Sequence, residues 1–391
     1  MTRTRSAAYD PDALAAAAPS YGSASLAELL PAVAAPMGVP GCTDRLGLPA
    51  ARAAAVLVVD GLGADLLAAH PREAPTLTEL AHEGLTLTTG FPSTTPTSLT
   101  CLCTGLPAGV HGLLGFQVVV GPAEGVDPPR VMNLLRWDAA VDPVGFQPHP
   151  TILERAEAAG VQVTTVGPRA FRGSGLTIAG LRGGGHAGAD SLGELAAGIV
   201  DALAGPGPRL VYGYHGDLDA TGHRHGVDSP AWRAQLAVVD RLVEMIRADL
   251  PAGAALYVTG DHGMIDVPGD ARVDVADSPE LQEGVLLVAG EPRVMYLTVR
   301  PGARDDVVDT WRGRLGADFW VVSVAEADAA GWFGGLRSSL VDRVGDVVVV
   351  ARGPVACVDS RSWDAGLLGL VGMHGSVTRE ERVVPLLTVG G

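Results

Sequence analysis

The chain has 391 residues, with 28 basic and 44 acidic side chains, a net charge of −16 and 47% hydrophobic residues. This composition favours a folded protein with one large core or two moderate ones, and it disfavours intrinsic disorder. All of the basic residues are arginine. The absence of lysine excludes Schiff-base and pyridoxal-phosphate chemistry, a Walker A loop and a lysine general base. The acidic balance also argues against a nucleic-acid-binding surface.

Cysteine usage predicts a reducing compartment. Cys101 and Cys103 lie in one apolar run, whereas Cys42 and Cys357 stand alone, so no disulfide framework is expected. The first residues lack the continuous apolar region of a secretory signal, and no apolar run reaches the roughly 18 residues of a membrane span. We therefore expect a soluble, cytoplasmic protein without a membrane partner.

Short apolar runs alternate with helical patterns through the first two thirds of the chain. Buried strands are expected at 53–61, 161–167, 209–215 and 254–263, and helices at 64–70, 151–159, 191–203 and 230–250. Strands that are apolar on both faces and alternate with helices are typical of a parallel sheet. The expected fold class is α/β, with a mostly parallel central sheet and helices on both of its faces.

The character of the sequence changes after residue 265. Residues 266–366 predict a small inserted α+β subdomain, because its apolar runs flank one helix in a separate β-α-β group. Residues 40–265 and 367–391 would then form the core. Residues 1–39, rich in Ala, Pro and Ser, are expected to form an N-terminal arm.

Candidate metal ligands occur in five separate segments, each at an expected strand end or helix start. They are Asp60 in VVDGLG, Thr94 and Thr95 in FPSTTPTSLT, Asp219 and His223 in GDLDATGHRHG, Asp261 and His262 in TGDHG, and His374 in GMHGS. Mixed carboxylate and imidazole ligands suit zinc or manganese, and a set of this size favours two ions. Two such ions, roughly 3.5–4 Å apart, can clamp the attacking and leaving oxygens of an in-line displacement at phosphorus. They would also give this acidic chain a local positive charge for phosphate.

Each segment taken alone has a simpler interpretation. Asp60 before glycine is typical of a turn, and His374 near the C-terminus is typical of a surface residue. The occurrence of all five segments in one order is what favours a functional site.

That order resembles the nucleotide pyrophosphatase/phosphodiesterase branch of the alkaline phosphatase superfamily, from about Ala53 to Gly375. The resemblance implies an alkaline-phosphatase-like core, a threonine or serine nucleophile at a helix start and two divalent metal ions. Its implied ligand sets are Asp219, His223 and His374 for one metal, and Asp60, Thr95, Asp261 and His262 for the other.

Two neighbouring threonines compete for the nucleophile position. Counting forwards from Phe91-Pro92 and backwards from Thr104-Gly105, both of which match the family pattern, selects Thr95 as the nucleophile in each case. Pro96 suits the first helical position, which predicts Thr95 as the N-cap. Pro96 also departs from the family pattern, because the N–H after the nucleophile contacts the phosphate in relatives and proline has none. Thr94 therefore stays an alternative.

Substrate contacts are predicted on the segment that follows the nucleophile helix. Asn133 is the only asparagine of the chain and could donate to a non-bridging phosphate oxygen. Phe116 or Trp137 could stack on a nucleobase or another leaving group. Ordinary loop packing explains these residues equally well.

The resemblance is compatible with several reactions of the superfamily, and the motifs exclude some of them. The nucleophile region has no CxPxR motif, which excludes a sulfatase, and the lack of lysine excludes the related phosphoglycerate mutases. No arginine lies between Arg72 and Arg130 to neutralise a dianionic phosphate, although Arg169, Arg172 or Arg182 could reach the site from a distance. We therefore expect hydrolysis of a phosphodiester or pyrophosphate in a small, nucleotide-like substrate, through a phosphothreonine on Thr95. The alternatives are a phosphomonoesterase, a phosphonate hydrolase, or a relative that binds a phosphorylated ligand without turnover.

Overall fold

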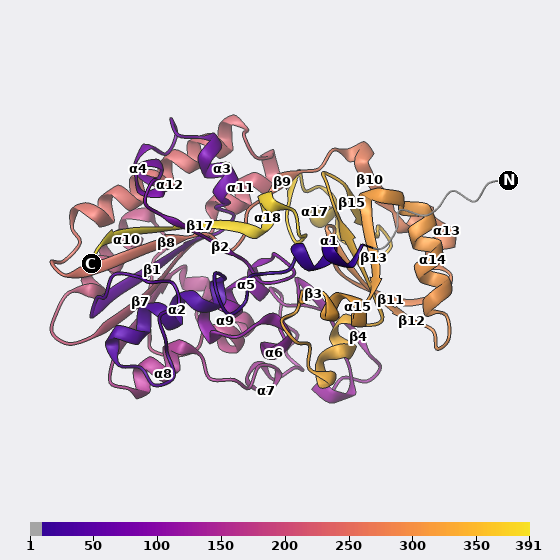
Figure 1. Ribbon diagram of the computed structural model, residues 1–391, viewed down its shortest axis with the longest axis horizontal. Coiled ribbons are helices and arrows are strands. Elements are labelled where there is room, and N and C mark those ends of the chain that lie inside the picture. The colour runs from indigo at the N-terminus through magenta and orange to yellow at the C-terminus, as the bar shows by residue number, and fades with distance from the viewer. Residues whose placement is uncertain (1–9) are drawn as a thin grey trace.

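A seven-stranded sheet forms the centre of the computed structural model, which describes residues 10–391 (Figure 1). The strand order is β2-β17-β8-β1-β7-β5-β6. The five strands from β8 to β6 are parallel, and only β17 runs antiparallel to its neighbours β8 and β2. This confirms the predicted mostly parallel sheet, although the sequence patterns did not predict the strand at the C-terminus. The strands are β1 (Ala53–Val59), β2 (Leu85–Thr88), β5 (Gln162–Gly167), β6 (Gly185–Gly188), β7 (Arg209–His215), β8 (Ala254–Thr259) and β17 (Val383–Gly390).

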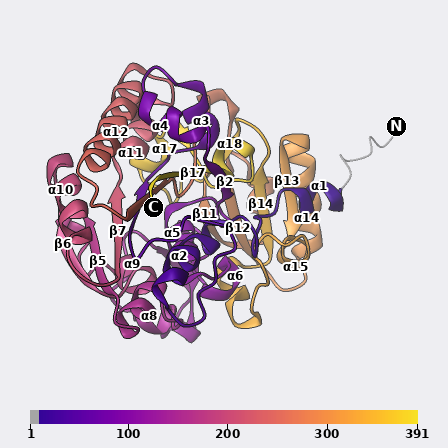
Figure 2. The same ribbon diagram turned by 60° about the vertical axis from the view of Figure 1, so that its left-hand side comes forward.

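Helices cover both faces of this sheet, as the side chains of β1 show. Val56 and Val58 pack in one buried cluster, whereas Leu57 and Val59 pack in another on the opposite face. Alternate residues of a strand point to opposite faces, so a strand that is apolar throughout requires cover on both. The views of Figures 1 and 2 show the two helical layers. One layer contains α2 (Leu26–Ala34), α5 (Thr95–Thr104) and α8 (Ile152–Ala158), and the other contains α3 (Ala64–Ala69), α4 (Pro75–Ala81), α10 (Leu192–Leu203) and α12 (Pro230–Ala248).

A second, antiparallel sheet lies within the stretch predicted as an insert, at the right of Figure 1. Its order is β11-β12-β14-β13, from β11 (Val285–Glu291), β12 (Val294–Val299), β13 (Phe319–Ser323) and β14 (Val347–Ala351). Trp311 of α14 (Arg304–Leu315) packs on one face with Met295 and Val349. On the other face, Tyr296 and Val348 belong to a buried cluster that includes Phe91 of the first sheet's domain. The second sheet is thus attached to the segment that carries the candidate nucleophile.

The predicted N-terminal arm is described only from residue 10 onward. Its helix α1 (Pro11–Ala16) contributes the fully buried Leu14, and the carbonyl of Leu14 accepts a hydrogen bond of 2.8 Å from the Trp332 indole. Residues 1–9 of the arm lie outside the described residues. The predicted limits of the arm, the core and the insert stay predictions.

Short elements connect these layers. They are α6 (Ala108–His111), β3 (Gln117–Val120), β4 (Arg130–Asn133), α7 (Pro143–Phe146), α9 (Gly175–Gly180), α11 (Asp217–His225), β9 (Ile265–Asp266), β10 (Arg272–Asp274), α13 (Pro279–Gln282), α15 (Val324–Ala329), α16 (Val341–Val344), β15 (Ala356–Val358), α17 (Ala365–Leu368), β16 (Gly372–Met373) and α18 (Arg379–Arg382).

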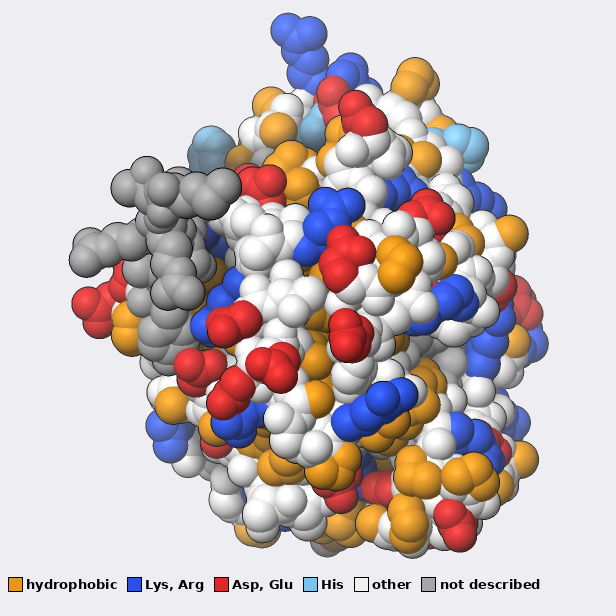
Figure 3. Space-filling model, turned by 90° about the vertical axis from the view of Figure 1, so that its right-hand side faces the viewer, with side chains coloured by type: hydrophobic (Ala, Val, Ile, Leu, Met, Phe, Trp, Pro, Cys, Tyr) orange, Lys and Arg blue, Asp and Glu red, His pale blue; other side chains and the backbone are white. Residues whose placement is uncertain are grey.

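The surface mixes charges of both signs. Acidic and arginine side chains are interspersed with hydrophobic ones over the face that Figure 3 shows. The four cysteines are free thiols. Within residues 10–391, no helix has both the length and the apolar character that a membrane crossing requires.

Candidate active site

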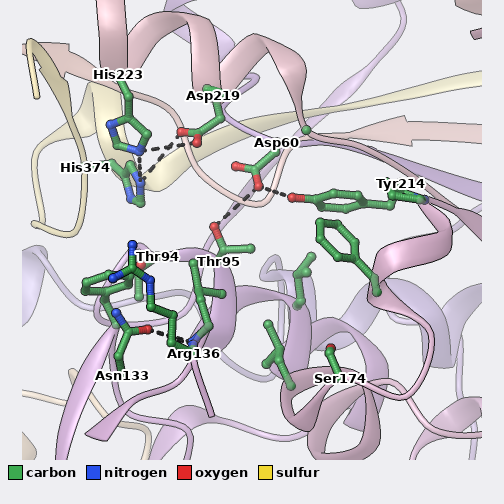
Figure 4. A pocket seen from close by; sticks show the side chains of 18 of the residues that line it. Asp60, Thr94, Thr95, Asn133, Arg136, Ser174, Tyr214, Asp219, His223 and His374 are labelled. Atoms are coloured by element: carbon green, nitrogen blue, oxygen red, sulfur yellow. Dashed lines mark hydrogen bonds and ion pairs between the residues drawn. The ribbon is translucent and has the colours of Figure 1, made fainter. Parts of the chain in front are cut away.

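The predicted ligands meet where strands of the central sheet end. Asp60 follows β1, and Asp261 and His262 follow β8, which is the parallel neighbour of β1. Parallel neighbours end at the same edge of a sheet, so their first loop residues lie side by side. Thr95 begins α5 at this edge, and Figure 4 shows its hydroxyl directed toward Asp60.

Helix α11 supplies two further ligands from one of its faces. Asp219 and His223 are four residues apart, and the His223 Nε2 lies 3.3 Å from an Asp219 carboxylate oxygen. The helix closely approaches the loop after β1, where Gly61 has a φ of +77°. A Cβ atom at Gly61 would lie 3.1 Å from the Asp219 Cα. Glycine is therefore required here for Asp219 to lie beside Asp60.

His262 lies between two groups of potential ligands. One group is Asp60, Asp261 and His262, and the other is Asp219, His262 and His374, with the ligand atoms of each group within 4.8 Å of one another. The His262 ring stacks on the His374 ring, with 3.5 Å between their centroids. His374 Nε2 in turn lies 3.3 Å from His223 Nε2. All of the predicted ligands therefore belong to one continuous cluster.

Backbone carbonyls orient the three imidazoles. His223 Nδ1 lies 2.8 Å from the carbonyl of Gly372, His262 Nδ1 lies 3.0 Å from that of Gly263, and His374 Nδ1 lies 3.0 Å from that of Ser93. A carbonyl only accepts hydrogen bonds, so each Nδ1 carries a proton, and in the neutral ring each Nε2 then presents a lone pair to the cluster. Metal-binding histidines typically have this arrangement.

Each of the three carboxylates at the site has one oxygen without a partner. Asp60 Oδ1, Asp219 Oδ1 and Asp261 Oδ2 are shielded from solvent and have no hydrogen-bond partner within the described part of the chain. Burial, and then the charges of Asp261 and Asp219, hold the pKa of Asp60 well above its usual range. Burial likewise raises the pKa of Asp261. Converging lone pairs and unpartnered carboxylate oxygens fit bound divalent cations, which would supply the missing positive charge.

The nucleophile candidate lies at the edge of this cluster. Thr95 Oγ1 is 3.2 Å from His262 Nε2 and 3.5 Å from Asp60 Oδ2. The predicted N-cap position was wrong by one residue, because α5 begins at Thr95 and Thr94 is the N-cap. Thr94 is extended, with φ −139° and ψ 153°, and its carbonyl accepts the first helical bond, from Ser98 N at 2.9 Å. The Thr95 hydroxyl therefore does not cap the helix and faces the ligands instead.

A cavity of about 1000 Å³ opens beside the cluster. Phe116 and Asn133 line it together with Thr94 and Thr95. The Asn133 side-chain oxygen accepts bonds from the backbone N–H groups of Leu135 at 2.8 Å and Arg136 at 3.1 Å. These two bonds fix the orientation of the amide and leave its NH₂ group available.

Trp137 is the predicted substrate contact that the structure does not bring to the cavity. Its indole N–H donates to the Val141 carbonyl at 2.9 Å, and its ring packs edge-on against Phe146 at 5.2 Å. A Cβ at Gly175 would lie 2.1 Å from the Trp137 ring, so the ring also packs against α9.

Three residues at the site were not predicted. The Tyr214 hydroxyl donates a hydrogen bond to Asp60 Oδ2, and Arg136 and Glu291 line the cavity. Arg136 follows the predicted Asn133 by three residues, and Tyr214 lies at the end of a predicted strand, so both had a local signal. Glu291 belongs to the second sheet, far from every motif, and had none.

The arginines proposed to reach the site from a distance do not line the cavity. Arg169 is paired with Asp190 and Glu194, and Arg182 with Glu154. The arginine that lines the cavity is Arg136, whose guanidinium lies 3.1 Å from Asp364.

Solved structures of similar fold were found, and two of the three described here hold a small phosphorus-containing ligand. An inactive form of murine ectonucleotide pyrophosphatase/phosphodiesterase 5, in complex with AMP, matches with a TM-score of 0.68 and 21% identity over 86% of this chain and 88% of that one. The human protein of the same name matches with a TM-score of 0.67 and 18% identity over 86% and 88%. Phosphonoacetate hydrolase from Sinorhizobium meliloti 1021, in complex with phosphonoformate, matches with a TM-score of 0.65 and 22% identity over 88% of this chain and 91% of that one.

These matches agree with the alkaline-phosphatase-like core that the motif order implied. A search of curated protein sequences found no match. The family model for type I phosphodiesterase/nucleotide pyrophosphatase matches residues 54–377, which include every ligand described above. The chain therefore belongs to the type I phosphodiesterase/nucleotide pyrophosphatase family.

Proposed function

We propose that this phosphoester hydrolase cleaves phosphodiester or pyrophosphate bonds in small, nucleotide-like molecules, with Thr95 as the nucleophile. The observation that carries the proposal is the position of the Thr95 hydroxyl, 3.2 Å from His262 Nε2, where the two ligand groups meet. An oxygen at this position is adjacent to both groups and faces the open cavity.

Two divalent ions, zinc in the first place and manganese as the alternative, are the cofactors that we propose. Asp219, His223 and His374 would hold one ion, and Asp60, Thr95, Asp261 and His262 the other. When bound, such ions polarise phosphoryl oxygens and lower the pKa of water. The fit rests on the three Nε2 lone pairs and on the carboxylate oxygens that lack partners.

The reaction would proceed in two in-line displacements. In the first, the bond from Thr95 Oγ1 to phosphorus forms as the bond from phosphorus to the leaving oxygen breaks, and the hydroxyl proton ends on the leaving group. In the second, water attacks phosphorus, the bond to Oγ1 breaks, a proton from the water restores the Thr95 hydroxyl, and the phosphomonoester is released. The N-terminus of α5 stabilises negative charge at Thr95 in both steps.

Residues around the cavity would orient the substrate. The free NH₂ group of Asn133 is a donor for a non-bridging phosphoryl oxygen, and the Phe116 ring offers an apolar surface to the leaving group. The AMP and phosphonoformate complexes of the similar structures support a small phosphorus-containing ligand.

One observation favours a second candidate function. Arg136 lines the cavity, and release from its ion pair with Asp364 would let it supply the extra positive charge that a dianionic phosphomonoester or a phosphonate needs. The similarity to a phosphonoacetate hydrolase points the same way. A third candidate is a relative that binds a phosphorylated ligand without turnover.

The test uses metal-stripped protein that is restored with zinc or manganese. Hydrolysis is measured on bis-p-nitrophenyl phosphate, p-nitrophenyl phosphate and phosphonoacetate. We expect the diester to be the best substrate. A preference for the monoester or for phosphonoacetate would select the second candidate, and inactivity on all three would select the non-catalytic relative.

A further inference from the structure

One acidic side chain of the cavity is not used by the proposed reaction. Glu291 is the last residue of β11, and the residue is only 4% exposed although it lines the cavity. Its Oε1 is shielded from solvent and has no hydrogen-bond partner in the part of the chain that the structure describes. A buried carboxyl oxygen without a partner costs free energy, so it calls for an explanation.

Glu291 lies beside the nucleophile segment. Its Cδ would be 2.6 Å from a Cβ at Gly375, which means that the carboxyl lies against the backbone of the residue after His374. Gly375 is bridged to Ser93 through a bond of 2.9 Å from Ser93 N to the Gly375 carbonyl. The Glu291 carboxyl is thus placed next to the two residues that precede Thr95.

The arginine nearest in sequence does not neutralise Glu291. Arg293 binds both carboxylate oxygens of Glu381, at 3.0 and 2.7 Å, and its remaining nitrogen donates to the carbonyls of Gly353 and Val355. Burial raises the pKa of Glu291 to about 8, and the neighbouring Thr94 side chain opposes part of this rise. A neutral carboxyl group is a hydrogen-bond donor.

The start of α5 lacks one backbone hydrogen-bond donor, which a neutral carboxyl group could replace. Pro96 follows Thr95 and has no N–H, so the backbone cannot donate from that position to a group on Thr95. Glu291 belongs to the wall of the cavity that Thr94 and Thr95 also line.

We propose that Glu291 is a substrate-contacting residue of this site, its carboxyl hydrogen bonding to a non-bridging oxygen of the phosphoryl group that Thr95 receives. The inference rests on the proposed function, because it takes Thr95 as the phosphoryl acceptor. It gives the second sheet a role in recognition, since β11 carries the residue to the core.

The experiment compares Glu291→Gln, which keeps a donor of the same shape, with Glu291→Leu, which removes it. Inorganic phosphate is the probe, because it contains the phosphoryl oxygens and no leaving group. For the zinc-restored protein, we expect Glu291→Leu to weaken phosphate binding in calorimetry by about 10- to 100-fold, and Glu291→Gln to stay within about threefold of the parent. Glu283→Leu, at an exposed glutamate of the same subdomain, serves as the control and should change nothing.

Stability separates a contact role from a structural one. Glu291→Leu removes an unpartnered buried polar group, so we expect an unchanged or higher melting temperature. Equal phosphate binding by the parent and the Leu variant would overturn the inference, as would a loss of binding that merely follows a lowered melting temperature. Phosphate binding requires no turnover, so a chain that hydrolyses no ester would refute the proposed function and still test Glu291.

Discussion

His223 and His374 face each other through their Nε2 atoms. Their Nε2 atoms are 3.3 Å apart, and each Nδ1 donates to a backbone carbonyl. With both rings neutral, no proton lies between the two Nε2 atoms, and their lone pairs repel each other unless a cation binds between them. Burial, followed by the charges of His262 and His223, holds the pKa of His374 well below its usual range, which disfavours relief by protonation.

Metal binding should therefore stabilise the fold. We expect zinc added to metal-stripped protein to raise the melting temperature, because a ligand at 100 times its Kd contributes about 2.7 kcal/mol. Differential scanning calorimetry gives the shift. His374→Ala should reduce the shift. A melting temperature of the parent chain that does not change on adding zinc would contradict the account.

Thr95 and Thr94 can be distinguished by parallel substitution. We expect Thr95→Ala to lower the turnover of bis-p-nitrophenyl phosphate by more than about a thousandfold, and Thr94→Ala by less than about tenfold. Rapid quenching followed by mass spectrometry should find the phosphoryl group on Thr95 in the parent. A Thr95→Ala protein of full activity would rule out the assignment.

Tyr214 should act on metal affinity through Asp60. Its hydroxyl donates a hydrogen bond to Asp60 Oδ2. Loss of a residue that orients a metal ligand typically lowers metal affinity by roughly 10- to 100-fold. We therefore expect Tyr214→Phe to weaken zinc binding by about that factor, measured by competition with a chelator. Tyr212→Phe, on the same strand, is the matched control, because it removes a buried hydroxyl that has no partner among residues 10–391. Equal affinities in both variants would show that the bond to Asp60 is unimportant.

Glu291 should make stability depend on pH. Burial raises its pKa in the folded state to about 8, from the usual 4.5, so between these values the folded chain binds more protons at this residue than the unfolded chain. Stability from this group is then present at low pH and is lost as the pH rises toward 8. We expect Glu291→Gln to stabilise the protein more near pH 8 than near pH 5 in urea unfolding. A gain of the same size at both values would show that Glu291 is not protonated in the fold.

The parts of the site that follow local rules could be predicted from the sequence. Asp60 and Asp261 directly follow apolar strands, as the strand patterns indicated. Asp219 and His223 share a face of α11, a helix that the sequence analysis did not predict. Thr95 was placed one position off in its helix, because Pro96 fits the first and the second helical position equally well. Whether the ligands bind metal stays a prediction.

Other features depend on packing that no local pattern records. After the second sheet, the chain returns to the central sheet as β17, which lies between β2 and β8 and runs antiparallel to both. Trp137 is directed away from the cavity by the Val141 carbonyl and by Phe146, and Glu291 reaches it only because β11 packs against the core. Contacts between distant segments decided these positions.

The central claim is that two cations bind beside Thr95, and zinc-edge anomalous diffraction from crystals of the zinc-restored protein tests it most directly. We predict two peaks, one among Asp219, His223 and His374 and the other among Asp60, Thr95, Asp261 and His262. Zinc found only elsewhere on the chain, with these seven side chains free of metal, would contradict the account.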